Sequence, residues 1–159
     1  MMSEALADRL FLALNACDEP FMDGVTSTWV LTERERLFNI QLRGMTILMH
    51  WLGQKRRYED ALEIGRRLLA ADPARESAQC EVMWLYVLNG QRAQAIRQYQ
   101  EFRIWLKREL DIEPMPETRA IYQHIRQEAD SRNVSFDNLL GAIEQSRREL
   151  YEVLSSQFT

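Results

Sequence analysis

Two histidines and two cysteines are the side chains of this 159-residue chain best suited to nucleophilic or metal chemistry. His50 and His124 lie far apart, and neither belongs to an HxxxH pair. Cys17 and Cys80 form no CxxC pair, so the spacing indicates no zinc site. The sequence also lacks a glycine-rich phosphate loop. We therefore expect no enzyme activity, no catalytic residue, no metal site and no cofactor.

The composition is that of an ordinary globular domain. Hydrophobic residues make up 46% and charged residues 28%, with only six Gly and four Pro, which argues against a loop-rich β-protein. No window resembles a membrane span and the N-terminus lacks a secretory pattern, so we expect a cytoplasmic protein. A net charge of −4 gives no electrostatic reason for direct contact with nucleic acid.

Apolar periodicity predicts an all-α fold of about seven helices. The Asp72-Pro73 pair predicts an N-cap and the first position of the fourth helix, and Asn89-Gly90 predicts the end of that helix. The expected helices cover residues 3–16, 28–55, 58–71, 73–88, 91–110, 116–129 and 135–155.

The long helix over residues 28–55 is expected to bury one apolar face. That face is made largely of Val30, Leu37, Ile40, Leu48, Trp51 and Leu52. We interpret the tryptophans, Trp29 and Trp105 among them, as core residues more often than binding anchors. Arg34 and Arg36 are expected to pair with acids such as Glu33.

The last expected helix carries an apolar residue at every seventh position, Phe136, Ile143 and Leu150. Two heptads are short for a coiled coil, so this helix either packs back on the domain or pairs with another chain in a homodimer. We assign residues 1–130 to one domain and residues 131–159 to this additional segment.

Two helical hairpins echo each other at a 34-residue offset. Ala61 corresponds to Ala95, and the pairs Leu48–Val82, Leu52–Tyr86, Gly65–Tyr99 and Leu68–Phe102 follow the same offset. This offset is the tetratricopeptide period, which predicts antiparallel hairpins stacked in a right-handed array. Arg92 replaces the aromatic residue that Tyr58 supplies in the first copy, and Lys107 replaces Pro73, so the second copy's last helix should run on.

Further motifs resemble the bacterial transcriptional activator domain, found in regulators of the actinomycete antibiotic regulatory type. The resemblance covers about residues 3–125. It is carried by Trp29-Val-Leu-Thr-Glu-Arg-Glu-Arg-Leu37, Tyr58-Glu-Asp-Ala-Leu62, Leu69-Ala-Ala-Asp-Pro73, Asn89-Gly-Gln-Arg-Ala-Gln-Ala95 and Leu106-Lys-Arg-Glu-Leu-Asp-Ile-Glu-Pro-Met-Pro-Glu-Thr118.

Two residues depart from the family pattern. Asp111 replaces a glycine, so that turn needs a strained left-handed residue or a different geometry. Met115 replaces a serine before Pro116 and thereby removes an N-cap worth about 1 kcal/mol.

The resemblance implies a regulatory domain that acts through protein partners, namely other copies of itself or RNA polymerase components. In the family a winged-helix DNA-binding domain usually precedes this domain, and this chain shows none. Two alternatives stay open: a domain that senses a small molecule in an apolar pocket, or a free-standing helical scaffold.

Five residues are candidates for contact with protein partners: Arg43, His50, Trp84, Arg97 and Arg108. In tetratricopeptide geometry the first helix of each pair lines a concave groove, which would hold Arg43, Thr46, His50, Ser77, Cys80 and Trp84. A groove filled by the first or last helix, and Trp84 in the core, are the competing interpretations.

Overall fold

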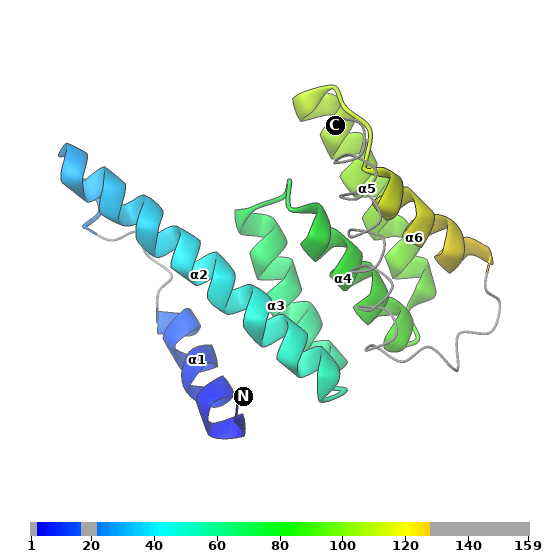
Figure 1. Ribbon diagram of the computed structural model, residues 1–159, viewed down its shortest axis with the longest axis horizontal. Helices are drawn as coiled ribbons and strands as arrows, with labels where there is room; N and C mark the ends of the chain where they lie inside the picture. The colour runs from blue at the N-terminus through cyan, green and yellow to red at the C-terminus, as the bar shows by residue number, and fades with distance from the viewer. Residues whose placement is uncertain (1–2, 17–21, 128–159) are drawn as a thin grey trace, which may run out of the picture. The chain divides into compact units, whose positions relative to one another are not determined.

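The computed structural model describes residues 3–16 and 22–127, and this part of the chain forms six α-helices and no β-strand (Figure 1). The all-α prediction is confirmed there. The expected helix over residues 135–155 and the proposed domain boundary at residue 130 lie outside the described residues. The helices are α1 (Glu4–Ala16), α2 (Thr28–Gln54), α3 (Tyr58–Ala71), α4 (Glu76–Leu88), α5 (Arg92–Leu110) and α6 (Pro116–Gln127).

The described part of the chain divides into two compact units, with the boundary between residues 78 and 79, inside α4. The first unit contains α1, α2 and α3. The second contains most of α4, followed by α5 and α6. Among the described helices, none has both the length and the apolar character needed to cross a membrane.

In the first unit, α2 packs against α1 and α3. The core combines buried residues of α2 and α3, among them Leu48, Met49, Ala61 and Leu68, all at most 1% exposed. The 27 residues of α2 rise about 40 Å, whereas the 14 residues of α3 rise only about 21 Å. As Figure 1 shows, the N-terminal half of α2 therefore projects beyond α3.

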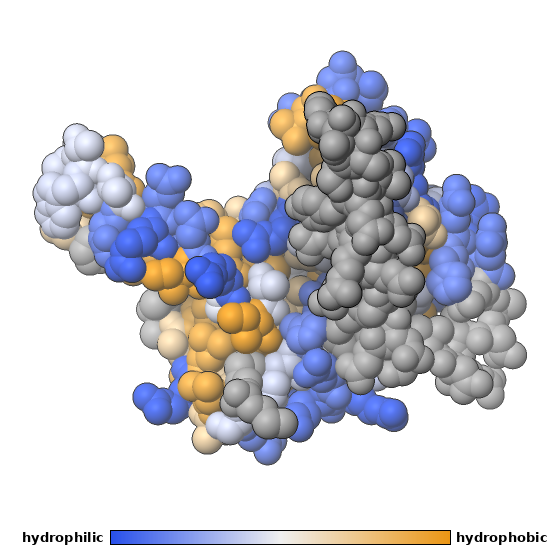
Figure 2. All heavy atoms as spheres, viewed as in Figure 1, coloured by the Kyte–Doolittle hydropathy of each residue, from blue (hydrophilic) through white to orange (hydrophobic). Residues whose placement is uncertain are grey.

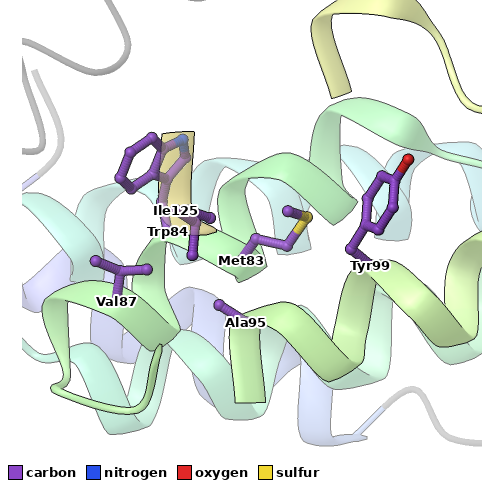
Figure 3. Close-up of a cluster of buried hydrophobic side chains, with 6 residues drawn as sticks. All are labelled: Met83, Trp84, Val87, Ala95, Tyr99 and Ile125. Atoms are coloured by element: carbon purple, nitrogen blue, oxygen red, sulfur yellow. The ribbon is translucent and has the colours of Figure 1, made fainter. Parts of the chain in front are cut away.

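In the second unit, three helices meet at one cluster of buried side chains (Figure 3). Tyr99 of α5 stacks on Tyr122 of α6, with ring centroids 3.9 Å apart and an angle of 10° between the planes. Burial raises the pKa of the Tyr99 hydroxyl, and the neighbouring Arg103 opposes that shift. The cluster is Met83, Trp84 and Val87 of α4, Ala95 and Tyr99 of α5, and Ile125 of α6.

The 34-residue echo is a structural repeat. Gln54 and Leu88 end α2 and α4, and Tyr58 and Arg92 begin α3 and α5, so both boundaries repeat at that offset. Ala61 is fully buried, as is Ala95. A side chain of one methyl group at these positions lets neighbouring helices approach closely. As predicted, α5 continues past Lys107, to Leu110.

The two first helices of the repeat end in the same backbone motif. Arg56 (φ 59°) and Gly90 (φ 75°), which correspond at the 34-residue offset, both adopt the left-handed conformation. The N–H of Arg57 donates to the carbonyl of Leu52, and the N–H of Gln91 donates to that of Tyr86. These are the long hydrogen bonds of the Schellman motif. The predicted end of α4 at Asn89-Gly90 is therefore confirmed.

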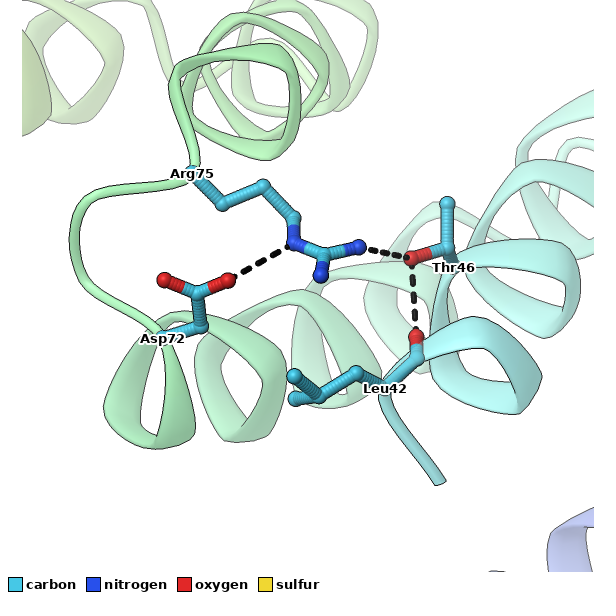
Figure 4. Close-up of polar contacts among 4 residues, drawn as sticks. All are labelled: Leu42, Thr46, Asp72 and Arg75. Carbon is cyan, nitrogen blue, oxygen red and sulfur yellow. Dashed lines mark hydrogen bonds and ion pairs between the residues drawn. The ribbon is translucent and has the colours of Figure 1, made fainter. Parts of the chain in front are cut away.

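The predicted start of α4 is wrong. Asp72 follows the last residue of α3 with an extended backbone, and Pro73 and Ala74 form a turn, so α4 begins at Glu76. The Asp72 carboxylate accepts a hydrogen bond from Nε of Arg75 at 2.9 Å. The Asp72 side chain therefore organises this turn and does not cap a helix that starts at Pro73 (Figure 4).

Arg75 also reaches α2. Its Nη1 lies 3.5 Å from Oγ1 of Thr46, which donates to the carbonyl of Leu42 at 2.9 Å (Figure 4). A second arginine, Arg67 of α3, donates to the carbonyl of Leu14 in α1 at 3.0 Å. Arg75 thus links the turn after α3 to α2, and Arg67 links α3 to α1. Neither contact was predicted from the sequence.

Candidate protein-interaction surfaces

The five predicted contact residues fall in different parts of the chain. On α2, Arg43 is exposed and His50 is half-buried; a seven-residue spacing places them on one helix face. Nε2 of His50 lies 3.1 Å from the Gln54 amide nitrogen. On α5, Arg97 and Arg108 are exposed and share a face three turns apart.

Trp84 lies in the core of the second unit. Its side chain is 3% exposed, and its ring centroid is 5.7 Å from that of His124 on α6. Among the described residues, none accepts a hydrogen bond from its indole Nε1. This placement favours the core interpretation of Trp84 over an exposed anchor.

The residues predicted to line a concave groove are divided between the two units. Thr46 lies on the same face of α2 as Arg43 and His50, but its hydroxyl is engaged by Leu42 and Arg75. Cys80 is buried, and its thiol donates to Oγ1 of Thr118 at 3.5 Å. In the described part of the chain, no group of three or more His, Cys, Asp or Glu residues is arranged to hold a metal ion.

The most distinctive surface of the first unit is apolar and lies on α2. Trp29 is 60% exposed and Ile40 is 50% exposed, so their expected burial is wrong. The reason is their orientation, since both lie on the face of α2 opposite the buried Leu42 and Met49. In Figure 2 hydrophobic residues gather over the middle of α2 and the neighbouring α1, and hydrophilic residues cover much of the N-terminal half of α2. The exposed large hydrophobic residues of α2 are Trp29, Leu31, Phe38, Ile40 and Ile47.

Two of these residues continue a buried row of α2. Leu31 and Phe38 are seven residues apart, and Phe38 is followed at helical spacing by Leu42, Met45 and Met49. The last three are at most 4% exposed, whereas Phe38 is 43% exposed and Leu31 is 50% exposed. The spacing of seven, four, three and four residues was the signal that could have identified this row from the sequence.

The charges beside this row are compensated locally. Nε of Arg36 donates to Oε2 of Glu33 at 2.9 Å, which confirms the expected pairing. This hydrogen bond holds the pKa of the Glu33 carboxyl below its usual value. The Arg34 guanidinium donates to the carbonyl of Met22 in the preceding turn. The surface is therefore apolar without a strong local charge.

The basic residues of α5 also have acidic neighbours. Arg103 pairs with Glu113 at 2.8 Å, and Lys107 pairs with Asp111 at 2.6 Å. The Arg103 guanidinium lowers the pKa of the Glu113 carboxyl by direct hydrogen bonding. Because these pairs offset the cationic charge, α5 has less basic character than its sequence suggests.

Comparison with known proteins identifies the family. The model of the bacterial transcriptional activator domain matches residues 3–126. The chain belongs to the bacterial transcriptional activator domain family. The resemblance drawn from the motifs is therefore confirmed.

Curated relatives of this bacterial transcriptional activator domain are transcription regulators. The chain is 31% identical over 124 residues to the transcriptional regulatory protein MoaR1 of Mycobacterium bovis (strain BCG / Pasteur 1173P2), covering 72% of the chain and 37% of the relative. It is 34% identical over 84 residues to MoaR1 of Mycobacterium tuberculosis (strain ATCC 25618 / H37Rv), covering 53% of the chain and 25% of the relative. The chain thus matches well under half of the relatives' length.

The structure shows what the family motifs do in this bacterial transcriptional activator domain. Val30 of the first motif is fully buried, whereas the preceding Trp29 is exposed. Asp111 has the left-handed backbone predicted for the glycine that it replaces, with φ 56°. Met115 precedes α6, and its carbonyl accepts the N–H of Arg119. A methionine side chain has no oxygen that could cap the helix.

Proposed function

We propose that this chain is a regulatory, protein-binding domain of a cytoplasmic bacterial transcription activator. It acts without catalysis, by associating with other copies of itself, by contacting RNA polymerase components, or by both. Direct contact with nucleic acid belongs to other parts of such a regulator. Family membership supports the role in transcription.

The apolar face of α2 is the observation that carries the protein-binding role. Scattered exposed hydrophobic residues are ordinary on a soluble protein, but a contiguous apolar patch marks an interaction site. Leu31 and Phe38 share one face of α2, are 50% and 43% exposed, and continue its buried row, so they form such a patch. Trp29, Ile40 and Ile47 are exposed on the opposite face of the helix. The compensated charges around Glu33 and Arg36 favour contact through apolar burial over contact through a strong electrostatic field.

A bacterial two-hybrid experiment tests the proposal. The full chain is paired with itself and, separately, with each RNA polymerase subunit. We expect a signal above background for at least one pairing. A matched variant, Phe38→Asp, places a charge on the α2 face and should reduce any signal that depends on this face. Expression of the chain without a signal in any pairing would reject the protein-binding role.

A small-molecule sensor is the second candidate function. The buried indole Nε1 of Trp84, without a hydrogen-bond acceptor among the described residues, is the observation in its favour. Buried polar groups are usually satisfied, and a ligand oxygen would satisfy this one. A metabolite that raises the melting temperature of the chain, but not that of a Trp84→Phe variant, would support this candidate. Melting temperatures unchanged across a broad metabolite set would count against it.

A further inference from the structure

We propose that the N-terminal half of α2 is the surface through which two copies of this chain pair. The two helices lie antiparallel, and each covers Leu31 and Phe38 of the other copy. This inference rests on the self-association named in the proposed function, and it adds the surface and its geometry.

The exposed row on α2 is continuous with a buried one. Leu42, Met45 and Met49 of α2 are buried, and Phe38 and Leu31 extend the same row into solvent. Because α3 is about half as long as α2, the uncovered row has the side-chain spacing of a helix-packing surface without its partner helix. A second helix laid along residues 31–38 would prolong the buried row.

The N-terminal half of α2 carries balanced charge. Residues 28–41 contain two acids and two bases, all within Glu33, Arg34, Glu35 and Arg36, so this half of α2 has no net charge. Glu33 pairs with Arg36, and Arg34 is directed to the backbone of Met22. A partner selected by strong acidic or basic charge would find no complement here. An identical copy meets no net repulsion and presents the same apolar row.

The position of α3 beside α2 favours the antiparallel orientation of the two copies. Packed helices lie about 8–10 Å apart. In a parallel pair, the C-terminal half of the second copy's α2 would occupy the place where α3 packs. In an antiparallel pair, that half runs past the start of the first α2, away from α3. A twofold axis between Arg34 and Glu35 then places Leu31 opposite Phe38 of the second copy, in the isologous arrangement of twofold dimers.

Light scattering and sedimentation of the full chain over a concentration series test this surface. We expect a monomer–dimer equilibrium. Leu31→Glu and Phe38→Glu should each raise the dissociation constant by roughly a hundredfold or more, because they would bury an unpaired carboxylate. The matched control is Ile104→Glu on α5, where the wild-type side chain is 66% exposed, and it should dimerise like the wild type. Circular dichroism and thermal melts verify that each variant folds.

The outcomes separate the surface from the proposed function. A dimer that both glutamate variants leave intact would overturn the α2 surface while self-association stands. A wild-type chain that stays monomeric at every concentration would overturn both this inference and the self-association, while the two-hybrid pairings with polymerase subunits would still test the other role.

Disulfide trapping tests the antiparallel register in a Cys17→Ser, Cys80→Ala background. A mixture of Leu31→Cys and Phe38→Cys chains should give an interchain disulfide faster than either variant alone. Faster cross-linking of Leu31→Cys with itself would contradict the antiparallel arrangement.

Discussion

Arg92 and Ile125 are joined by a hydrogen bond across 33 positions of the chain: Nε of Arg92, at the start of α5, donates to the Ile125 carbonyl of α6 at 2.7 Å. Nη2 of the same guanidinium donates to the Arg126 carbonyl at 2.6 Å. These carbonyls belong to the last described turn of α6, where helix carbonyls lack intrahelical partners. Arg92 replaces the aromatic residue of the repeat motif, and its guanidinium links α5 to α6 through these two hydrogen bonds.

Arg92→Ala should lower the free energy of unfolding by about 1–3 kcal/mol, because it removes two hydrogen bonds from a charged donor. Urea denaturation followed by circular dichroism measures the change. Arg92→Tyr restores the motif residue but not the hydrogen bonds, so we expect it to destabilise as well. A stability equal to wild type for both variants would show that the contact contributes nothing.

Arg56→Gly should stabilise the chain by about 1 kcal/mol, since a non-glycine residue pays an energetic penalty in the left-handed conformation. The matched control is the corresponding position in the second hairpin. Gly90→Ala should destabilise by a similar amount, and it tests backbone strain alone because an added Cβ would meet nothing within 4 Å. Chemical denaturation of both variants should show opposite signs, and equal signs would refute the shared strain at Arg56 and Gly90.

Met115→Ser should stabilise α6 by about 1 kcal/mol, because the serine hydroxyl supplies an oxygen acceptor for N–H groups of the first helical turn. Met115→Ala lacks that acceptor and is the control for loss of the methionine side chain. We expect the serine variant to melt at a higher temperature than the alanine variant in calorimetry. Identical melting temperatures would contradict the capping role of this position.

The Arg103–Glu113 pair should make stability depend on pH in the acid range. The folded-state pKa of Glu113 lies below its usual value of 4.5 because Arg103 donates a hydrogen bond to the carboxylate. Its contribution is therefore present above the unfolded pKa and is lost as the pH falls through the folded pKa. Glu113→Gln should be less stable than wild type at pH 7, and the difference should shrink towards pH 3.

A double-variant comparison isolates this effect. In an Arg103→Gln background the carboxylate loses its partner, so Glu113→Gln should change the acid dependence of stability little. Denaturant midpoints measured from pH 3 to pH 7 give both comparisons. An unchanged acid profile in the single Glu113→Gln variant would contradict the assignment.

Local sequence signals were sufficient for most helix boundaries. The end of α4 just before Gly90 follows from the conformational freedom of glycine. The continuation of α5 past Lys107 follows from the absence of a proline at that position. Both are properties of single residues. The start of α4 was missed because the Asp72 carboxylate had two local uses, as an N-cap or as a partner of Arg75. Side-chain pairing decided between them.

The candidate site was less predictable than the fold. Arg43, His50, Arg97 and Arg108 were placed on their helices correctly, but their role in binding stays a prediction. Trp29 and Ile40 were expected to be buried from apolar character alone. Periodicity reports which residues share a face, and it does not report which face the neighbouring helices cover.

The sequence by itself determined the all-α class, the 34-residue repeat and the family, because helical periodicity and ordered motifs are written in the residue types. Only the tertiary structure decided which side of α2 is covered, that Arg92 holds the last described turn of α6, and that Trp84 lies in the core. Each of these depends on where a distant helix ends or packs. The exposed row at Leu31 and Phe38 is a consequence of that geometry.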